Sequence, residues 1–157
     1  MKTKSLLTVI MLLTTWMGFA QSNLFDKLSD HKDITQVTVT KELLSMVPGM
    51  ASSMNMNGVD IKDIVDKLEQ IDIFTTEEKT SMQLMQKEVS AFLKGNKSYE
   101  ALMKIKEVGE NVSFYAQKDG ELIKSLLMFV DGEDECVVIR LLGKFKTEDV
   151  QKIIKNK

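Results

Sequence analysis

The chain has 157 residues with one cysteine and one histidine, and its 21 basic and 23 acidic residues give a net charge of −2. This length fits one domain, and it is sufficient to bury a core without disulfide bonds. Because nucleic-acid binding needs a surplus of positive charge on one face, the acidic balance argues against nucleic acid as a partner. A single cysteine also excludes an intramolecular disulfide.

Residues 1–20 have the pattern of a removable signal peptide. Lys2 and Lys4 precede an apolar run over residues 6–13, and Gly18 and Ala20 are small residues at the positions that a signal peptidase recognises. The run is too short for a committed membrane span, and the alternative is an anchor that stays uncut. Cleavage after Ala20 leaves residues 21–157 as a single α+β domain. Its net charge is −4, because the removed segment carries two lysines and no acid.

The residue after the predicted cut bears on the location of the protein. It is Gln21, whereas a lipid-anchored exported protein carries a cysteine at this place. The sequence therefore predicts a periplasmic or secreted protein that has no lipid anchor, no stable membrane span after cleavage near Ala20, and a soluble mature form.

The first half of the chain alternates short helices with short strands. Apolar residues spaced three and four apart predict the helices, and alternation with β-branched residues predicts the strands. The expected helices cover residues 22–30, 41–47 and 60–68. The expected strands cover residues 34–40 and 70–74.

A long helix is expected to follow the second strand. Residues 75–78 read Thr-Thr-Glu-Glu, which fits a capping box with Thr75 as the N-cap and Glu78 reaching back. The helix should run to about Lys94, where Gly95-Asn96 closes it. Its expected buried stripe is Met82, Met85, Val89 and Phe92.

Four strands in succession dominate the second half, and a short helix from Thr147 ends the chain. Glycine and aspartate mark the tight connections between the strands. The segment Leu122–Val130 is apolar on both faces, which favours a central strand that is covered on both sides. The expected strands are Tyr99–Glu107, Asn111–Gln117, Leu122–Val130 and Cys136–Leu142.

Together these elements predict the α+β class. We expect a mostly antiparallel sheet of about six strands, with helices on one face and a four-stranded meander in the C-terminal half.

Few residues are candidates for chemistry. A nucleophilic serine or cysteine needs a base beside it, and the only histidine, His31, is expected in a solvated loop. Cys136 is expected to behave as a small buried hydrophobe, with an intermolecular disulfide or a reactive thiol as alternatives. The acidic residues 131–135 do not have the spacing of a helix-flanked calcium loop and fit a hairpin turn. We therefore expect no catalytic residue, no cofactor and no enzymatic activity, with a carboxylate hydrolase as a minor alternative.

Clustered methionines are the one weak metal candidate. Met46, Met50, Met54 and Met56 fall within eleven residues. Thioether sulfur suits Cu(I), so these residues could form a weak copper site. The other interpretation is a flexible apolar lip that packs on the sheet or on a partner. The pattern leaves both interpretations open.

The chain also resembles a known family. Its leader and several apolar segments are similar to those of small exported proteins of Bacteroidetes-type bacteria, known only as domain of unknown function 4252. The resemblance implies an envelope location and a Gram-negative host, and it supplies no catalytic residues. The segments that carry it are Leu24-Phe25-Asp26, Ile73-Phe74-Thr75-Thr76-Glu77, Leu102-Met103-Lys104-Ile105-Lys106, Tyr115, Leu126-Leu127-Met128-Phe129-Val130 and Gly143.

These observations favour a binding module over an enzyme. We expect a sheet face or sheet edge to meet a protein, a peptide or a lipid-like ligand in the envelope, because edge strands can accept another strand. The alternative is a self-associating structural envelope protein, a homodimer that buries one face of Leu122–Val130.

Overall fold

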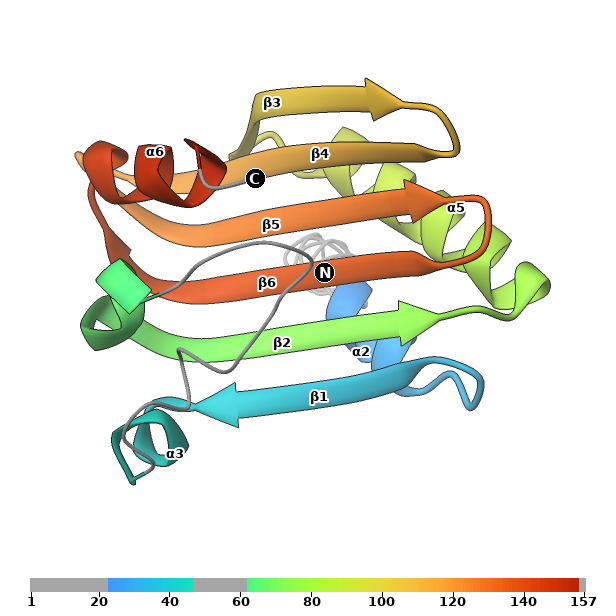
Figure 1. Ribbon diagram of the computed structural model, residues 1–157, viewed down its shortest axis with the longest axis horizontal. Helices are drawn as coiled ribbons and strands as arrows, with labels where there is room; N and C mark the ends of the chain where they lie inside the picture. Colours follow the sequence, from blue (N-terminus) through green and yellow to red (C-terminus); the bar gives the residue numbers. More distant parts are fainter. Residues whose placement is uncertain (1–22, 47–61, 156–157) are drawn as a thin grey trace, which may run out of the picture.

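The computed structural model describes residues 23–46 and 62–155. In this part of the chain, six strands form one sheet in the order β1-β2-β6-β5-β4-β3, and every neighbouring pair is antiparallel (Figure 1). The predicted α+β class and the C-terminal meander are confirmed. The strands are β1 (Thr35–Thr40), β2 (Leu68–Thr76), β3 (Tyr99–Glu107), β4 (Glu110–Asp119), β5 (Leu122–Gly132) and β6 (Cys136–Phe145).

The helices lie on both sides of this sheet, whereas the sequence suggested one side. Figure 1 shows α2 (Leu24–Ser29) and α5 (Lys79–Gly95) behind the sheet. In front of it lie α3 (Lys41–Met46), the 3₁₀ helix η2 (Lys62–Lys67) and α6 (Thr147–Lys155). No helix of the described residues is both long enough and apolar enough to span a membrane.

Two apolar clusters explain why both faces are covered. Because side chains alternate along a strand, the central strands contribute to both clusters. In β5, Leu127 packs with α2 and α5, whereas Leu126 and Met128 belong to the cluster that includes Val150 and Ile153 of α6. The prediction of a central, doubly apolar strand is thus confirmed, since β5 lies between β4 and β6 and buries side chains on both faces.

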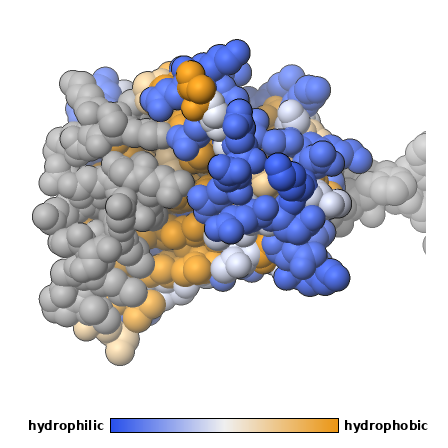
Figure 2. Space-filling view, turned by 45° about the vertical axis from the view of Figure 1, so that its right-hand side comes forward, coloured by the Kyte–Doolittle hydropathy of each residue, from blue (hydrophilic) through white to orange (hydrophobic). Residues whose placement is uncertain are grey.

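Hydrophilic side chains gather on one side of the molecule beside an apolar band, as Figure 2 shows.

Two of the tight turns need glycine, since Gly109 and Gly120 have φ values of 80° and 62°. The turn after β5 is joined to the turn after β3, because the Glu133 N–H donates to the Gly109 carbonyl at 3.0 Å. The predicted acidic hairpin turn therefore also ties two hairpins together.

Two local predictions differ from the structure. Thr75 is not the N-cap of α5, because β2 continues to Thr76 and Glu78 caps the helix instead. The Glu78 carboxylate accepts from the N–H groups of Thr80 and Ser81, at 3.1 and 2.7 Å. The second difference is the expected helix over residues 60–68, whose described part is 3₁₀ rather than α and ends where β2 begins at Leu68.

Candidate functional site

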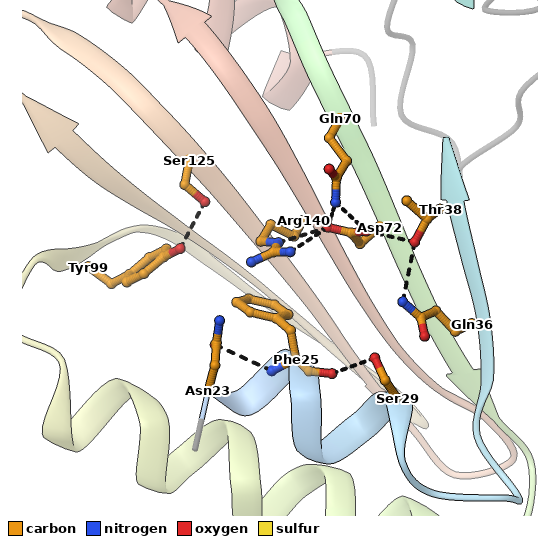
Figure 3. A network of polar contacts seen from close by, with 10 residues as sticks. All are labelled: Asn23, Phe25, Ser29, Gln36, Thr38, Gln70, Asp72, Tyr99, Ser125 and Arg140. Carbon is orange, nitrogen blue, oxygen red and sulfur yellow. Dashed lines mark hydrogen bonds and ion pairs between the residues drawn. The ribbon is translucent and has the colours of Figure 1, made fainter. Parts of the chain in front are cut away.

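A buried ion pair joins β2 to β6 on the face that α2 covers. Nε and Nη2 of Arg140 donate to Oδ2 of Asp72, at 2.9 and 2.6 Å (Figure 3). The Asp72 side chain is only 2% exposed, and the Arg140 side chain is 16% exposed. Such a pair is stable only when further hydrogen bonds satisfy the buried carboxylate.

The strand register supplies those further bonds. Thr38, Asp72 and Arg140 lie directly opposite one another on β1, β2 and β6, so they form one row across three strands. The Thr38 hydroxyl donates to Oδ1 of Asp72 at 2.9 Å, and the Gln70 amide donates to the same oxygen at 2.8 Å. Cross-strand neighbours of this kind are the usual unit of side-chain interaction in a sheet. Both carboxylate oxygens of Asp72 therefore accept hydrogen bonds, from Thr38, Gln70 and Arg140.

The Arg140 guanidinium also stacks on an aromatic ring. Its Cζ lies 3.6 Å from the ring centroid of Phe25 on α2, a favourable cation–π contact. The ring of Phe92 on α5 meets Phe25 edge-on at 5.7 Å, and Tyr99 lies 5.3 Å from Phe92. Arg140 is thus fixed from two directions, by a carboxylate on its own sheet and by a ring on the facing helix.

Local bonds position the Phe25 ring. The Asn23 side chain caps α2 by accepting from the Phe25 N–H at 3.4 Å. At the other end, the Ser29 hydroxyl donates to the Phe25 carbonyl at 2.7 Å. Figure 3 shows these contacts on α2 directly below Arg140. The short helix is therefore anchored where it supports the guanidinium.

A cavity of about 520 Å³ opens beside this contact, and we call it the Arg140 cavity. It lies between α2, the C-terminal part of α5 and the sheet. Nη1 of Arg140 has no hydrogen-bond partner among the described residues. At the rim, Lys27 and Glu88 form an ion pair at 2.6 Å. The residues that line the cavity include Phe25, Phe92, Tyr99, Asn23, Asn96, Gln117 and Leu142.

Tyr99 connects the cavity to the sheet interior. Its hydroxyl is 2.8 Å from the Ser125 hydroxyl, and Ser125 is buried. Burial raises the pKa of Tyr99 above its usual value, although the Ser125 hydrogen bond and the nearby Arg140 charge oppose this rise. Tyr99 therefore stays neutral at physiological pH and lines the cavity with a ring whose hydroxyl group is hydrogen-bonded to Ser125.

The lining of the cavity combines aromatic surface with the charged guanidinium of Arg140. Ligand sites are usually concave and mostly apolar with a few fixed polar groups, and here three aromatic side chains and one guanidinium line the same cavity. Arginine forms strong, directional hydrogen bonds with carboxylates. Neither His31 nor Cys136 lines the cavity.

Of the four methionine candidates, the structure describes only Met46. Met46 lies at the end of α3 and is 77% exposed. Met50, Met54 and Met56 lie outside the described residues. Within residues 23–46 and 62–155, no group of three or more histidine, cysteine or acidic side chains is placed to hold a metal ion.

Cys136 is buried, as the sequence predicted. Its thiol donates to Oδ1 of Asp131 at 3.7 Å, and the Gln86 amide donates to the same oxygen at 2.6 Å. Burial, together with the Asp131 charge, raises the pKa of Cys136 to about 12. His31 lies in the loop before β1, as expected, but it is half-buried rather than solvated, and its Nδ1 has no partner in the described part of the chain.

Sequence reasoning missed the two central residues of this site. Arg140 is the only arginine of the chain, and Asp72 is the one acid within the segment Ile71–Phe74. A charged residue inside an apolar strand is costly to bury unless it is paired. This signal could have nominated each residue, although it could not show that the two meet.

The comparisons with known proteins give a family and no closer match. Neither the search of curated proteins nor the search of solved structures finds a match. The family model described as a domain of unknown function (DUF4252) matches residues 25–153. This range includes all six strands of the described residues and nearly all of the residues around the Arg140 cavity, and it agrees with the resemblance seen in the sequence. The chain belongs to the DUF4252 family.

Proposed function

We propose that this protein is an exported, non-catalytic binding module, and that the Arg140 cavity is its ligand site. The observation that carries the proposal is the guanidinium of Arg140, whose Cζ lies 3.6 Å from the Phe25 ring centroid in the lining of a cavity of about 520 Å³. The signal-like pattern of residues 1–20 supports export to the periplasm or the exterior.

The lining chemistry defines the class of ligand. Phe92 and Tyr99 offer ring surface to a planar or aromatic group. The Nη1 group of Arg140 offers a charged donor, which favours a carboxylate or a similar acceptor. The ligand is therefore a small acid whose apolar, planar part occupies the space between α2 and α5.

Preorganisation strengthens the argument for binding. Asp72 and Phe25 already fix the guanidinium, so a ligand would not have to order a flexible side chain. Ordering a long side chain on binding costs about 0.5–1.5 kcal/mol, and this cost is avoided here. The Asp72 charge lowers the net attraction for an anion, so the apolar contacts must supply much of the affinity.

Hydrocinnamate is a suitable probe, with its uncharged amide as the matched comparison. We expect hydrocinnamate to bind with a Kd of about 1 mM, as befits a ligand of this size. The amide should bind at least about fivefold more weakly, because it lacks the charge that Arg140 recognises. The measurement is a titration followed by NMR, which reads the Nε–H signal of the single arginine together with the backbone signals of residues 91–96.

A variant that fills the cavity makes the test specific. Ala91 lines the cavity on α5 and is exposed, so Ala91→Trp should occupy the space without breaking the ion pair. Its matched control is Ala101→Trp, at an exposed position on β3 outside the cavity. The proposal fails if hydrocinnamate gives no saturable shift, or if Ala91→Trp and Ala101→Trp bind it equally well.

A further inference from the structure

The hydrogen-bonding groups around the Arg140 cavity suggest which class of acid it takes. Three carboxamide side chains line the cavity, and each comes from a different element. Asn23 caps α2, Asn96 caps the C-terminal end of α5, and Gln117 lies on β4. A carboxamide has one acceptor oxygen and one donor nitrogen, so each can serve a ligand only through the atom that the protein does not already use.

Gln117 lies on the floor of the cavity. It is directly opposite Tyr99 of β3 and Ser125 of β5, and Ser125 is in turn opposite Leu142 of β6. Facing residues of an antiparallel sheet have their side chains on the same face. Gln117 therefore stands between the Tyr99 ring and Leu142, both of which also line the cavity.

Ser98 fixes the orientation of two of the carboxamides. Oδ1 of Asn96 accepts from the Ser98 backbone N–H at 3.3 Å and from the Ser98 hydroxyl at 2.6 Å. Because this hydroxyl gives its only hydrogen to Asn96, its oxygen can only accept from Gln117, whose Nε2 donates to it at 2.7 Å. The Gln117 amide is thus held with its nitrogen toward Ser98. Among the described residues, no hydrogen bond reaches its Oε1.

The other unused groups are donors. Within residues 23–46 and 62–155, Nδ2 of Asn96 has no hydrogen-bond partner, because its Oδ1 is the atom that faces Ser98. The same holds for Nδ2 of Asn23, whose Oδ1 accepts from the Phe25 N–H. Together with Nη1 of Arg140, these side chains offer a ligand donors at three atoms and an acceptor at one, Oε1 of Gln117.

This set complements a peptide group that lies beside a carboxylate. The carboxylate would accept from Arg140. The amide N–H would donate to Gln117, and the amide carbonyl would accept from an asparagine Nδ2. An aromatic side chain next to the carboxylate would lie against Phe92 and Tyr99. An acid without an N–H group leaves the acceptor of Gln117 unused.

There is also space for a longer ligand. A second cavity of about 300 Å³ shares Gln117 and Leu142 with the Arg140 cavity. A chain that continues from an acyl group at Gln117 can therefore extend toward this second cavity.

We propose that the ligand of the Arg140 cavity is an N-acylated aromatic amino acid with a free carboxylate, either as a small molecule or as the C-terminal residue of a peptide. The inference rests on the proposed ligand function and adds the amide group to it. Arg140 binds the carboxylate, and Gln117 accepts from the amide N–H. Gln117 is thereby the residue that determines specificity, because its acceptor distinguishes an amide from an ester.

Three probes that differ in one group test the amide. N-acetylphenylalanine is hydrocinnamate with an added acetamido group, and O-acetylphenyllactate has an ester oxygen in place of the amide N–H. We expect N-acetylphenylalanine to bind about tenfold more tightly than hydrocinnamate and at least about fivefold more tightly than the ester, which cannot donate to Gln117. Each Kd is measured by NMR titration, from the Nε–H signal of the single arginine and the backbone signals of residues 91–96.

Variants locate the preference for the amide over the ester. Gln117→Leu should make the two affinities equal, because it removes the acceptor. Ser98→Ala should reduce the preference about twofold, since the Gln117 amide can then turn and only about half of the molecules present Oε1. Gln83→Leu, at an exposed position of α5 outside the cavity, should leave the preference unchanged. The ratio of two affinities within one variant does not depend on a general loss of stability.

A longer probe distinguishes the two sources of such a ligand. Acetyl-Gly-Gly-Phe extends toward the second cavity, and binding at least about fivefold tighter than that of N-acetylphenylalanine assigns the C-terminus of a peptide. Equal binding assigns a single acylated amino acid.

The outcomes separate this inference from the proposed function. If hydrocinnamate binds saturably but N-acetylphenylalanine binds no more tightly, the amide assignment is wrong, whereas the acid site remains. A preference for the amide that survives Gln117→Leu would also overturn the assignment. If neither hydrocinnamate nor N-acetylphenylalanine binds, the ligand site itself is wrong.

Discussion

Arg140 and Asp72 are 68 residues apart in sequence, yet the Nη2 of one lies 2.6 Å from the Oδ2 of the other. The β2–β6 register places the two residues directly opposite each other. Around them, Thr38 and Gln70 satisfy the carboxylate and Phe25 covers the guanidinium. This contact links the structural core to the cavity that we propose as the ligand site.

Removing the carboxylate should therefore destabilise the protein. Asp72→Asn leaves Arg140 without its counter-charge in a largely buried place, and we expect the free energy of unfolding to fall by about 3 kcal/mol. The exposed pair of Lys118 and Glu100 provides the control, because Glu100→Gln should cost less than about 1 kcal/mol. Urea unfolding of both variants measures the difference. Equal losses would mean that the buried pair contributes no more than a surface pair.

Replacing Gly143 by alanine should be costly for a different reason. An added Cβ would collide with the backbone carbonyl of Lys67 and would lie 2.7 Å from Cζ of Phe145, which is fully buried. We expect Gly143→Ala to lower the free energy of unfolding by at least about 2 kcal/mol. The same substitution at Gly95 meets no atom within 4 Å, and there it should raise the stability by about 0.5–1 kcal/mol. Thermal unfolding distinguishes the two variants.

The Glu78 cap should make stability depend on pH in the acid range. Hydrogen bonds from the N–H groups of Thr80 and Ser81 lower the pKa of Glu78 from 4.5 to about 2. A lowered folded-state pKa means that the stabilisation is complete above the unfolded value of 4.5 and is lost as the pH falls toward 2. Glu78→Gln should therefore lower the Tm most above pH 4.5, and the difference from the parent should shrink toward pH 2.

The neighbouring Glu77→Gln serves as the control for this pH series, since Glu77 makes none of the capping bonds to Thr80 or Ser81. Circular dichroism melts across the acid range measure both variants. A Tm difference for Glu78→Gln that stays constant with pH would contradict the cap as the cause.

Cys136 should be unreactive in the folded protein. It is buried, and its pKa of about 12 keeps the thiol protonated, whereas the thiolate is the reactive form. We expect iodoacetamide to leave Cys136 unmodified at mildly alkaline pH and to modify it fully in urea, as measured by intact mass. A Val37→Cys variant should gain one fast modification under native conditions, because Val37 is 46% exposed. Rapid native labelling of Cys136 itself would contradict its burial.

Local sequence patterns were sufficient to predict the strands of the C-terminal meander. The predicted starts at Tyr99, Leu122 and Cys136 coincide with the observed strands β3, β5 and β6. The reason is that alternation and glycine turns act between residues that are near in sequence. The same locality made the α2 region and the Met82, Met85 and Val89 stripe of α5 predictable.

Local patterns failed where distant pairing decides the outcome. Thr75 and Thr76 match a capping box in isolation, but their backbones pair with Val137 and Cys136 of β6, so the strand continues through them. The N-cap then moves to Glu78. Similarly, the apolar spacing over residues 60–68 predicts an α-helix, whereas Leu68 is already paired with Gly143 in the sheet. In both cases a long-range ladder overrides a local preference.

The sequence by itself determined the α+β class and the strand succession after residue 98, because these follow from side-chain periodicity and glycine-containing turns. Tertiary structure alone decided that the second and last strands are neighbours. This pairing brings Asp72 to Arg140, sets Arg140 against Phe25, and leaves β1 at one edge of the sheet that the described residues form. The physical reason is that strand order depends on which surfaces bury each other across the whole chain, and no short segment contains that information.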